Sequence, residues 1–354
     1  MIAFLFPSVV LCIYCRFRAG VILCNIGLPT SRKCLWLSLE YASHNLISQD
    51  DSNLTPVLVL THALALYDKP ALRILFWSPT VEMISYVVTG ANRGIGFGFI
   101  QTLSADPNNV VFALTRNKAT SVNLLNLESK QKNVHVLQAD ITNVPALRAV
   151  AKAVENVTGG TLNVLINNGA YLETTRAEYT LEMYDGKEDI LDEDFNNFFK
   201  VNTLGVIKTI NIFLPLLRKA SHTALAKVIT ISSAAGDMEF NKKANIDFFV
   251  PYAVSKAAVN MAMAKYATRF KDENLLFLSL SPGFVNTMTD QPQEVQDELY
   301  GNYAKLFAEA YPEWSGTPLT PEQSVAAVLD TVSKLTVKDS GKFMSHNGDN
   351  ETWI

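Results

Sequence analysis

The sequence Thr89-Gly90-Ala91-Asn92-Arg93-Gly94-Ile95-Gly96 decides the fold, because it places a glycine-rich turn between two segments of different character. The apolar run before it, Ile84–Thr89, is typical of a strand, and residues from about Ile95 to Ser104 after it are typical of a helix. Glycines let the backbone turn tightly and approach a phosphate, and the following helix offers free N–H groups at its positive dipole end. The turn therefore predicts a nucleotide site. Its candidate contacts are Gly90, Asn92, Arg93, Gly94, Ile95 and Gly96.

From Ile84 onward, short apolar runs alternate with longer helical segments. The expected strands are 84–89, 109–115, 134–138, 162–167, 227–232, 275–280 and 341–345. The expected helices are 95–104, 145–157, 195–220, 251–271 and 321–335. Two stretches, 171–192 and 284–320, break the alternation and are expected to be loop-like or irregular. The alternation is typical of an α/β fold, a doubly wound parallel sheet with helices on both faces.

The end of the second expected strand indicates which dinucleotide binds. An acidic residue about 20 positions beyond the glycines would bind the ribose hydroxyls of NAD, whereas an arginine would bind the 2′-phosphate of NADP. Arg116 stands at this place, and Arg93 in the turn could pair with the same phosphate. Asp140, after the third strand, could accept a hydrogen bond from the adenine amino group. These residues favour NADP(H) as cofactor. For each of them the alternative is an ordinary surface arginine or a helix-capping aspartate.

Of the twelve tyrosines, Tyr252 alone has a lysine four residues later, Lys256. On a helix these two positions share a face, so the phenol and the ammonium are expected to lie side by side. A phenol titrates near 10, and a neighbouring ammonium would lower its pKa. Tyr252 could then give a proton to a ketone oxygen while a hydride reaches the carbon.

The composition excludes several classes of function. The chain has 354 residues, of which 48% are hydrophobic and 18% charged, with a net charge of −4. No basic stripe is present, so no nucleic-acid partner is expected. The four cysteines, Cys12, Cys15, Cys24 and Cys34, all lie near the N-terminus, which fits a reducing, cytoplasmic location for the main body. Cys12 and Cys15 have no His or acidic neighbour, so no metal site is expected.

Residues 1–83 are expected to be a hydrophobic, poorly specified extension to the domain of residues 84–354. A membrane anchor over residues 1–28 is the disfavoured alternative, because the apolar run is shorter than the 20 or so residues that span a bilayer. Residues 19–83 show no sustained helical or strand period. Met83 stands directly before the first strand, so a natural protein that begins there is a further alternative.

Several motifs share an order and spacing with one known family. They are the Thr89–Gly96 turn, Asp140, Asn167-Asn168-Gly169-Ala170, Asn202, Ser232-Ser233-Ala234-Ala235-Gly236, Tyr252 with Lys256, and Ser281-Pro282-Gly283. Over residues 84–346 the sequence resembles the short-chain dehydrogenase/reductase family. The resemblance implies a Rossmann-type fold with a single catalytic domain, a small-molecule carbonyl substrate and NADP(H). It also implies a homo-oligomer, with the helices near 195–220 and 252–271 at the interface.

The resemblance also assigns roles to individual residues. Tyr252 resembles the general acid/base and Lys256 the ribose-binding lysine that tunes it, while Ser233 resembles the hydroxyl that holds the substrate carbonyl. Asn202 resembles the asparagine that supports a proton-relay water, and Thr287 the threonine near the nicotinamide carboxamide. The further cofactor contacts implied are Ile141, Asn168, Gly169, Pro282, Gly283 and Val285.

Three features depart from the family pattern. The family usually has Asn-Asn-Ala-Gly after the fourth strand, and here the last two residues are exchanged. The interval from Ser233 to Tyr252 is 19 residues, longer than usual, and the extra residues near 237–249 are expected to border the substrate pocket. The first 80 or so residues have no counterpart.

Within the family, the sequence is most similar to the sniffer and C-factor carbonyl reductases and to fungal norsolorinic acid ketoreductases. The similarity lies in Phe97-Gly98 after the turn, in 114–117 and in 339–343. It implies a bulky or aromatic ketone as substrate. The alternative from another class is a regulator that binds NADP(H) without chemistry. The joint presence of Ser233, Tyr252 and Lys256 argues against it.

Overall fold

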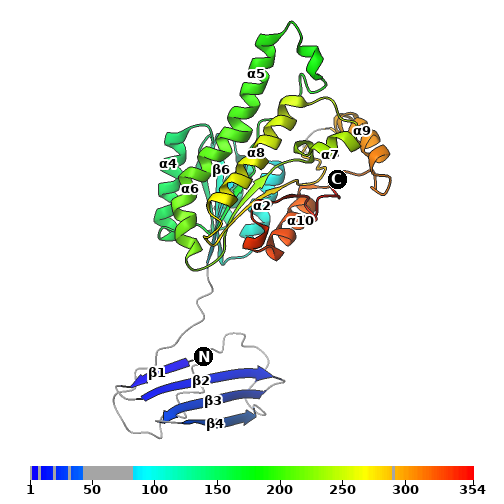
Figure 1. Cartoon of the computed structure of the whole chain (residues 1–354). Helices are drawn as coiled ribbons and strands as arrows, with labels where there is room; N and C mark the ends of the chain where they lie inside the picture. Colours follow the sequence, from blue (N-terminus) through cyan, green and yellow to red (C-terminus); the bar gives the residue numbers. More distant parts are fainter. Residues whose placement is uncertain (1, 7–8, 19–20, 31–32, 43–82, 289–291) are drawn as a thin grey trace. The chain divides into compact units, whose positions relative to one another are not determined.

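The computed structural model describes residues 2–6, 9–18, 21–30, 33–42, 83–288 and 292–354, and the chain divides into two units, Met1–Val81 and Glu82–Ile354. In the first unit four antiparallel strands pair in sequence order (Figure 1). They are β1 (Ile2–Phe6), β2 (Val9–Arg18), β3 (Val21–Thr30) and β4 (Lys33–Ala42). Strands β3 and β4 lie where the sequence indicated no period. Apolar and polar residues alternate strictly only over the short run 37–41 of β4, and β3 shows no alternation, so these two strands have no sustained period.

The second unit contains a seven-stranded sheet in which every pairing is parallel. Its strands are β5 (Ile84–Thr89), β6 (Asn109–Thr115), β7 (Val134–Gln138), β8 (Val164–Asn167), β9 (Ala226–Ile231), β10 (Leu275–Leu280) and β11 (Phe343–Met344). The order across the sheet is β11-β10-β9-β8-β5-β6-β7. All six residues of β10 are buried, as a strand covered on both faces requires. The predicted fold class is confirmed.

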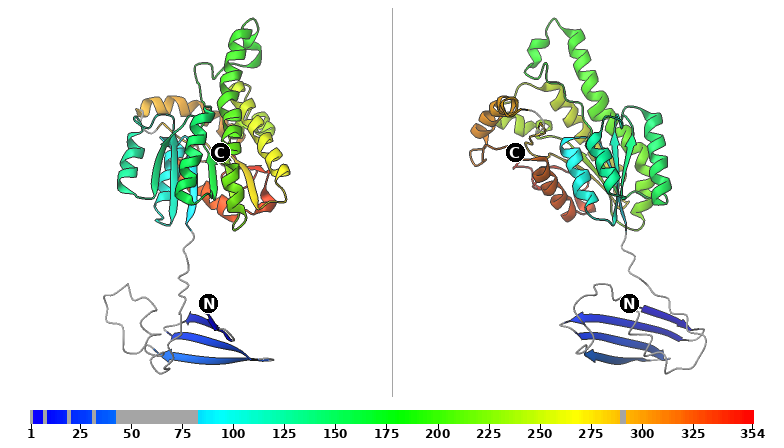
Figure 2. Two further views of the ribbon diagram at one scale, coloured as in Figure 1. Left: turned by 90° about the vertical axis from the view of Figure 1, so that its left-hand side faces the viewer. Right: turned by 180° about the vertical axis from the view of Figure 1, so that it is seen from behind.

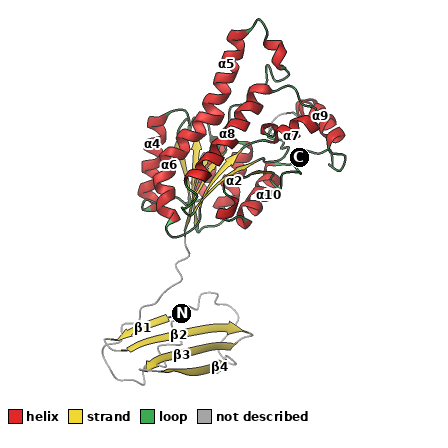
Figure 3. Cartoon of the chain, in the orientation of Figure 1, coloured by secondary structure: helices red, strands yellow, loops and turns green. Residues whose placement is uncertain are grey.

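Helices cover both faces of this sheet (Figures 2 and 3). Apolar side chains of α4 (Val144–Thr158), α6 (Val206–Ser221) and α8 (Val250–Arg269) form one core with the strands. The opposite core is formed by α2 (Gly94–Ser104), α3 (Val122–Lys130) and α10 (Pro321–Lys334). The chain order reverses between β5 and β8, and the carboxyl ends of the strands at this point are where such sheets bind ligands.

The helix predicted over 195–220 is part of a longer one. Helix α5 (Glu188–Phe199) continues through the π-helical turn η2 (Lys200–Gly205) into α6. Glu188 and Asp189 in the first turn favour an earlier start, because acidic side chains stabilise a helix N-terminus. The combined Glu188–Ser221 helix is apolar and long enough to cross a membrane, but half of its most apolar window is buried in the protein. That burial is expected of a core helix.

Residues predicted to be irregular contain further helices. Between 284 and 320 lies α9 (Gln293–Ala310), and between 171 and 192 lie the short η1 (Leu181–Tyr184) and the start of α5. Among the described residues, the remaining short helices are η3 (Ala234–Gly236), α7 (Met238–Lys243) and η4 (Val337–Asp339). The prolines at 292 and 312 flank α9 rather than interrupt it. Helix α9 is held by aromatic packing, since Tyr303 and Phe307 contact Phe284 with ring centroids 6.2 and 4.9 Å away. Such long-range contacts leave no local signal.

Candidate active site

The glycine-rich turn is a place where only glycine fits. Gly90 and Gly94 have φ angles of +65° and +52°, in the left-handed region that favours glycine. A Cβ on Gly90 would lie 2.6 Å from the Cα of Gly169, and one on Gly96 would lie 2.2 Å from the carbonyl oxygen of Gly90. The side chain of Arg93 makes no capping hydrogen bond at the start of α2. The Arg93 side chain therefore does not cap the first N–H groups of α2. A helix start of this kind can bind an anion.

Asn168 and Thr89 hold this turn against the end of β8. The Thr89 hydroxyl accepts hydrogen bonds from the backbone N–H groups of Asn168 and Gly169, each at 3.0 Å. The Asn168 amide donates to the carbonyl oxygens of Thr89 and Gly90, both at 3.1 Å. Asn168, predicted as a cofactor contact, thus uses its side-chain donors to shape the turn.

Replacing Gly96 with alanine should destabilise the protein by about 1–3 kcal/mol and weaken dinucleotide binding, because the new methyl group meets backbone that cannot move freely. Gly301→Ala is the matched control. Gly301 lies in α9 with nothing within 4 Å of an added Cβ, so this change should stabilise by about 0.5–1 kcal/mol. Urea unfolding of both variants checks the opposite signs. Equal stability of Gly96→Ala and the wild type would contradict the steric argument.

The residues predicted for the adenosine end lie beyond β5, β6 and β7. Arg93 and Arg116 are exposed, and Asn92 beside them is exposed as well. Burial acts to raise the pKa of Asp140, but hydrogen bonds from Thr142 and the nearby charges of Arg116 and Lys200 outweigh it and lower the pKa. Asp140 is therefore a carboxylate at neutral pH.

Ile141 and Lys200 connect this end to the π-helical turn. Ile141 is buried, and its side chain packs against Gly205, where an added Cβ would lie 3.0 Å from Ile141 Cδ1. Lys200, at the start of the same turn, lies close enough to Asp140 to lower its pKa. Sequence analysis did not select Lys200.

Tyr252, Ser233 and Lys256 come together at the ends of β9 and α8. Tyr252 is half-buried, and the Ser233 side chain lies close enough to its phenol to act on the pKa of that phenol. Ser233 follows β9, and its Oγ accepts a hydrogen bond of 3.2 Å from the Ala235 N–H. Lys256, 4% exposed, donates from Nζ to the Ile231 carbonyl at 2.9 Å. The three residues predicted to carry the chemistry therefore form one cluster.

The expected effect of Lys256 on the phenol is not what the structure gives. Burial raises the pKa of Tyr252, with the nearby Ser233 side chain opposing it, so the ammonium does not lower it below its ordinary value. Burial also lowers the pKa of Lys256 to about 8. The Lys256 Nζ lies 5.5 Å from the Tyr252 ring centroid and points to a backbone carbonyl, so desolvation outweighs their mutual attraction.

Asn202, in the π-helical turn, uses its side chain to fix a loop. Its Oδ1 accepts from the Tyr171 N–H at 2.7 Å, and its Nδ2 donates to the Tyr171 carbonyl and to Ser255 Oγ, both at 3.1 Å. Ser255 in turn donates to the Tyr252 carbonyl at 2.7 Å. Asn202 thereby ties the chain after β8 to the first turn of α8. Its part in a proton relay stays a prediction.

The segment after β10 closes back on the glycine-rich turn. A Cβ on Gly94 would lie 3.3 Å from Thr287 Cβ, so the Thr287 side chain lies against the turn. The Thr287 N–H donates to the Tyr300 hydroxyl of α9 at 3.0 Å, and Val285 bridges to Leu319. Upstream, Gly283 has a φ of +84°, and the Pro282 carbonyl accepts a 2.6 Å hydrogen bond from Ser324. Thr287, predicted to lie near the nicotinamide carboxamide, thus packs against the turn predicted to bind the diphosphate.

The sequence profile of the family described as short chain dehydrogenase matches residues 85–298. The chain belongs to this family. A short-chain dehydrogenase/reductase of Arthrinium sp, AtnB, is 40% identical over 75% of this chain and 98% of its own length. The solved structure of an NADPH-bound carbonyl reductase from chicken fatty liver is 29% identical, with a TM-score of 0.62, over 77% of this chain and 100% of its own. Sniffer, a carbonyl reductase of D. melanogaster, is 25% identical at the same TM-score and coverage. The predicted family and its fungal and sniffer-like character are confirmed.

This short-chain dehydrogenase is therefore an oxidoreductase, and its site includes residues that sequence reasoning missed. These residues are Thr89, Tyr171, Phe249 and Tyr300, which each contact a predicted site residue or its backbone, and Lys200, whose charge lowers the pKa of Asp140. Thr89, as the last residue of a buried strand, carried a signal in its polarity. The others depend on partners distant in sequence.

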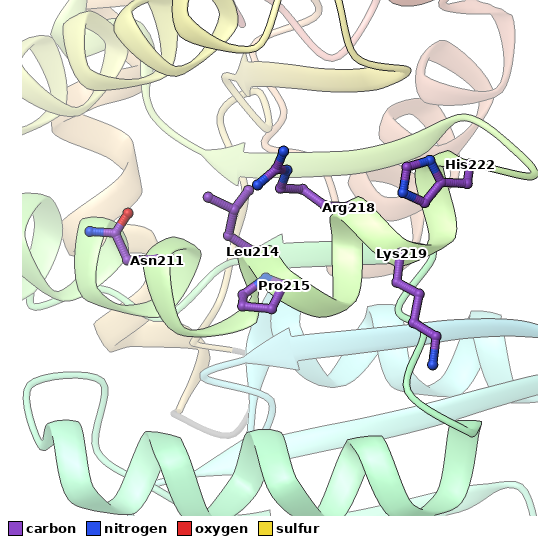
Figure 4. A pocket seen from close by; sticks show the side chains of 6 residues that line it. All are labelled: Asn211, Leu214, Pro215, Arg218, Lys219 and His222. Atoms are coloured by element: carbon purple, nitrogen blue, oxygen red, sulfur yellow. The ribbon is translucent and has the colours of Figure 1, made fainter.

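A surface hollow of about 420 Å³ lies on α6 of the short-chain dehydrogenase, away from all the predicted site residues (Figure 4). It is lined by Asn211, Leu214, Pro215, Arg218, Lys219 and His222. Its cations already have partners, since Arg218 pairs with Glu273 at 2.7 Å and Lys219 donates to the Gly159 carbonyl at 2.9 Å. The hollow is thus no candidate for the catalytic site.

Proposed function

We propose that this chain is an NADP(H)-dependent reductase that converts a ketone or related carbonyl to an alcohol, with Tyr252 as general acid. The observation that carries the proposal is the cluster of Ser233, Tyr252 and the buried Lys256, whose Nζ lies 5.5 Å from the Tyr252 ring centroid. The NADPH that the chicken carbonyl reductase contains supports the same cofactor here.

The residues present fit an NADP cofactor. Gly90 and Gly96 approach neighbouring backbone tightly and Gly94 packs against the Thr287 side chain, which leaves the start of α2, not capped by Arg93, as a cradle for a diphosphate. Arg93 and Arg116 would hold the 2′-phosphate, while Asp140, kept ionised, would accept from the adenine amino group. When bound, the cofactor would supply the hydride that reduces the carbonyl carbon.

The chain's own groups would handle the oxygen. The hydroxyls of Ser233 and Tyr252 can both donate to a carbonyl oxygen, which polarises the bond and places the phenol for proton transfer. The raised pKa of Tyr252 keeps the phenol protonated at neutral pH, the form that reduction needs. Lys256 is buried, with its Nζ 5.5 Å from the Tyr252 ring centroid. It would bind the cofactor ribose and stabilise the phenolate after the proton has left.

Aromatic side chains near Tyr252 support a bulky or aromatic ketone as substrate. Phe249 and Phe198 contact the Tyr252 ring at centroid distances of 4.8 and 6.2 Å. Flat apolar substrates gain more from such surroundings than small polar ones do.

The deciding experiment is consumption of NADPH and NADH across aromatic ketones, quinones and aldehydes. Substrate-dependent oxidation of NADPH, with formation of the matching alcohol, is the expected result. Tight NADPH binding with no turnover of any carbonyl would instead favour the alternative of a non-catalytic regulator.

Arg116→Ala should raise the KM for NADPH about tenfold or more and leave that for NADH unchanged, because a charge-assisted hydrogen bond to the 2′-phosphate is lost. Arg148→Ala is a matched control, since Arg148 is an exposed arginine of α4 outside the predicted cofactor set. Initial rates with both dinucleotides separate the cases. An equal change for NADPH and NADH would remove Arg116 from phosphate recognition.

A further inference from the structure

Phe249, the residue before α8, has an unusual backbone conformation. Its φ and ψ angles are +60° and +33°, and among the described residues only Asn245 is another non-glycine residue with positive φ. A bulky side chain in this left-handed region costs about 1–2 kcal/mol. The conformation is held by a 2.8 Å hydrogen bond from the Phe249 N–H to the Ala177 carbonyl. Glycine or asparagine would adopt it more readily, so the aromatic side chain requires a reason.

The Phe249 ring is stacked on the ring of Tyr252. The two centroids are 4.8 Å apart and the planes differ by 24°. Phe198, which is buried, meets both rings edge-on, at 6.2 Å from Tyr252 and 6.4 Å from Phe249. Tyr171 in turn meets Phe198 edge-on at 4.9 Å. The Tyr252 ring therefore has Phe249 stacked on its face and Phe198 against it edge-on, and both contacts restrict its rotation.

The strained backbone of Phe249 and the stacking of its ring on Tyr252 are linked. The left-handed backbone at Phe249 sets the direction in which its ring leaves the chain, three residues before Tyr252. The adjacent Phe248 shares none of this, because its ring contacts Tyr303 of α9 at 6.2 Å. Backbone strain held by surrounding structure is concentrated at functional sites.

We propose that Phe249 is a positioning residue, which holds the Tyr252 ring in the orientation where its hydroxyl meets Ser233. The proposal rests on the proposed function, since it concerns the general acid of that reaction. Phe249 itself needs no contact with substrate or cofactor. Its effect comes through the geometry of the tyrosine, where a displacement of about 1 Å can cost 10²-fold in rate.

Phe249→Asn is the decisive variant, because asparagine tolerates the left-handed backbone but provides no ring to stack. The expected result is a kcat lower by about 10- to 100-fold, with the Kd for NADPH within about twofold of wild type. Phe249→Tyr keeps the ring and should restore most of the loss. Phe248→Asn is the matched control. It should leave the pH profile of kcat unchanged even where the KM for substrate moves.

A readout independent of activity is the NMR signal of Tyr252 in protein labelled with ¹³C-tyrosine, assigned by its loss in Tyr252→Phe. In Phe249→Asn, the signal should show faster ring flipping, and the phenol should titrate at lower pH because water reaches it. Unchanged flipping and titration would overturn the proposal, whatever the rates. If the wild type turns over no carbonyl, the proposed function fails while this measurement still decides the role of Phe249. Phe249→Leu provides a second ring-free variant should the asparagine variant fold poorly.

Discussion

Replacing Tyr252 with phenylalanine is expected to lower kcat/KM for NADPH-dependent ketone reduction by about 10²- to 10⁴-fold and to leave the Kd for NADPH unchanged. The change removes one hydroxyl and keeps the ring, so the stacking with Phe249 and the edge contact with Phe198 are retained. Only the hydroxyl near Ser233, the proposed proton donor, is lost. Steady-state rates and fluorescence titration with NADPH measure the two quantities separately.

Tyr266→Phe is the control for this prediction, because Tyr266 lies on the same helix and also loses a hydroxyl. Its phenol donates a 2.7 Å hydrogen bond to Asn211, far along α8 from Tyr252. The control should cost about 1 kcal/mol of stability and no activity. Residual turnover above a tenth of wild type in Tyr252→Phe would remove Tyr252 from the role of general acid.

The sheet could be read from the sequence because its strands are covered on both faces. Strand β10 is apolar except for Ser279, and β5 is followed at once by the glycine-rich turn, so both could be predicted with the bounds that the structure shows. Helix α9 could not be read, because its stability comes from rings such as Phe284 and Trp314, which meet it from outside the helix. A local sequence pattern thus predicts which segments are buried, but not which distant residues they pack against.

The site follows the same division. The pairing of Tyr252 with Lys256 could be predicted from helical spacing, and the resemblance to the family assigns Ser233 to the same site. The pKa shifts could not, because the spacing of Tyr252 and Lys256 gives their separation on a helix but not the desolvation that dominates both. Nor could Phe249, whose backbone conformation depends on Ala177, 72 positions earlier.

The burial of Lys256 has a measurable consequence for stability. Its pKa is about 8 in the folded protein, against an ordinary value of 10.5. Below about pH 8 both states carry the charge, and the folded state bears the full cost of burying it. Between about pH 8 and 10.5 the unfolded state binds more protons, so stability rises with pH through this window. The side chain is 4% exposed, so solvent screening removes little of the effect.

Lys256→Met should remove this pH dependence. It should also abolish activity, because the proposed ribose-binding group is lost. Relative to the variant, the unfolding free energy of wild type is expected to rise by about 3 kcal/mol between pH 7 and pH 10.5. Urea unfolding at several pH values measures the difference, in which the titration of other groups cancels. Lys265→Met, at an exposed position of α8, is the control and should run parallel to wild type. If the unfolding free energies of wild type and Lys256→Met ran parallel with pH, burying the charged form of Lys256 would cost no stability. The ammonium of Lys256 would then be as well solvated in the folded protein as in the unfolded chain. Burial would not lower its pKa.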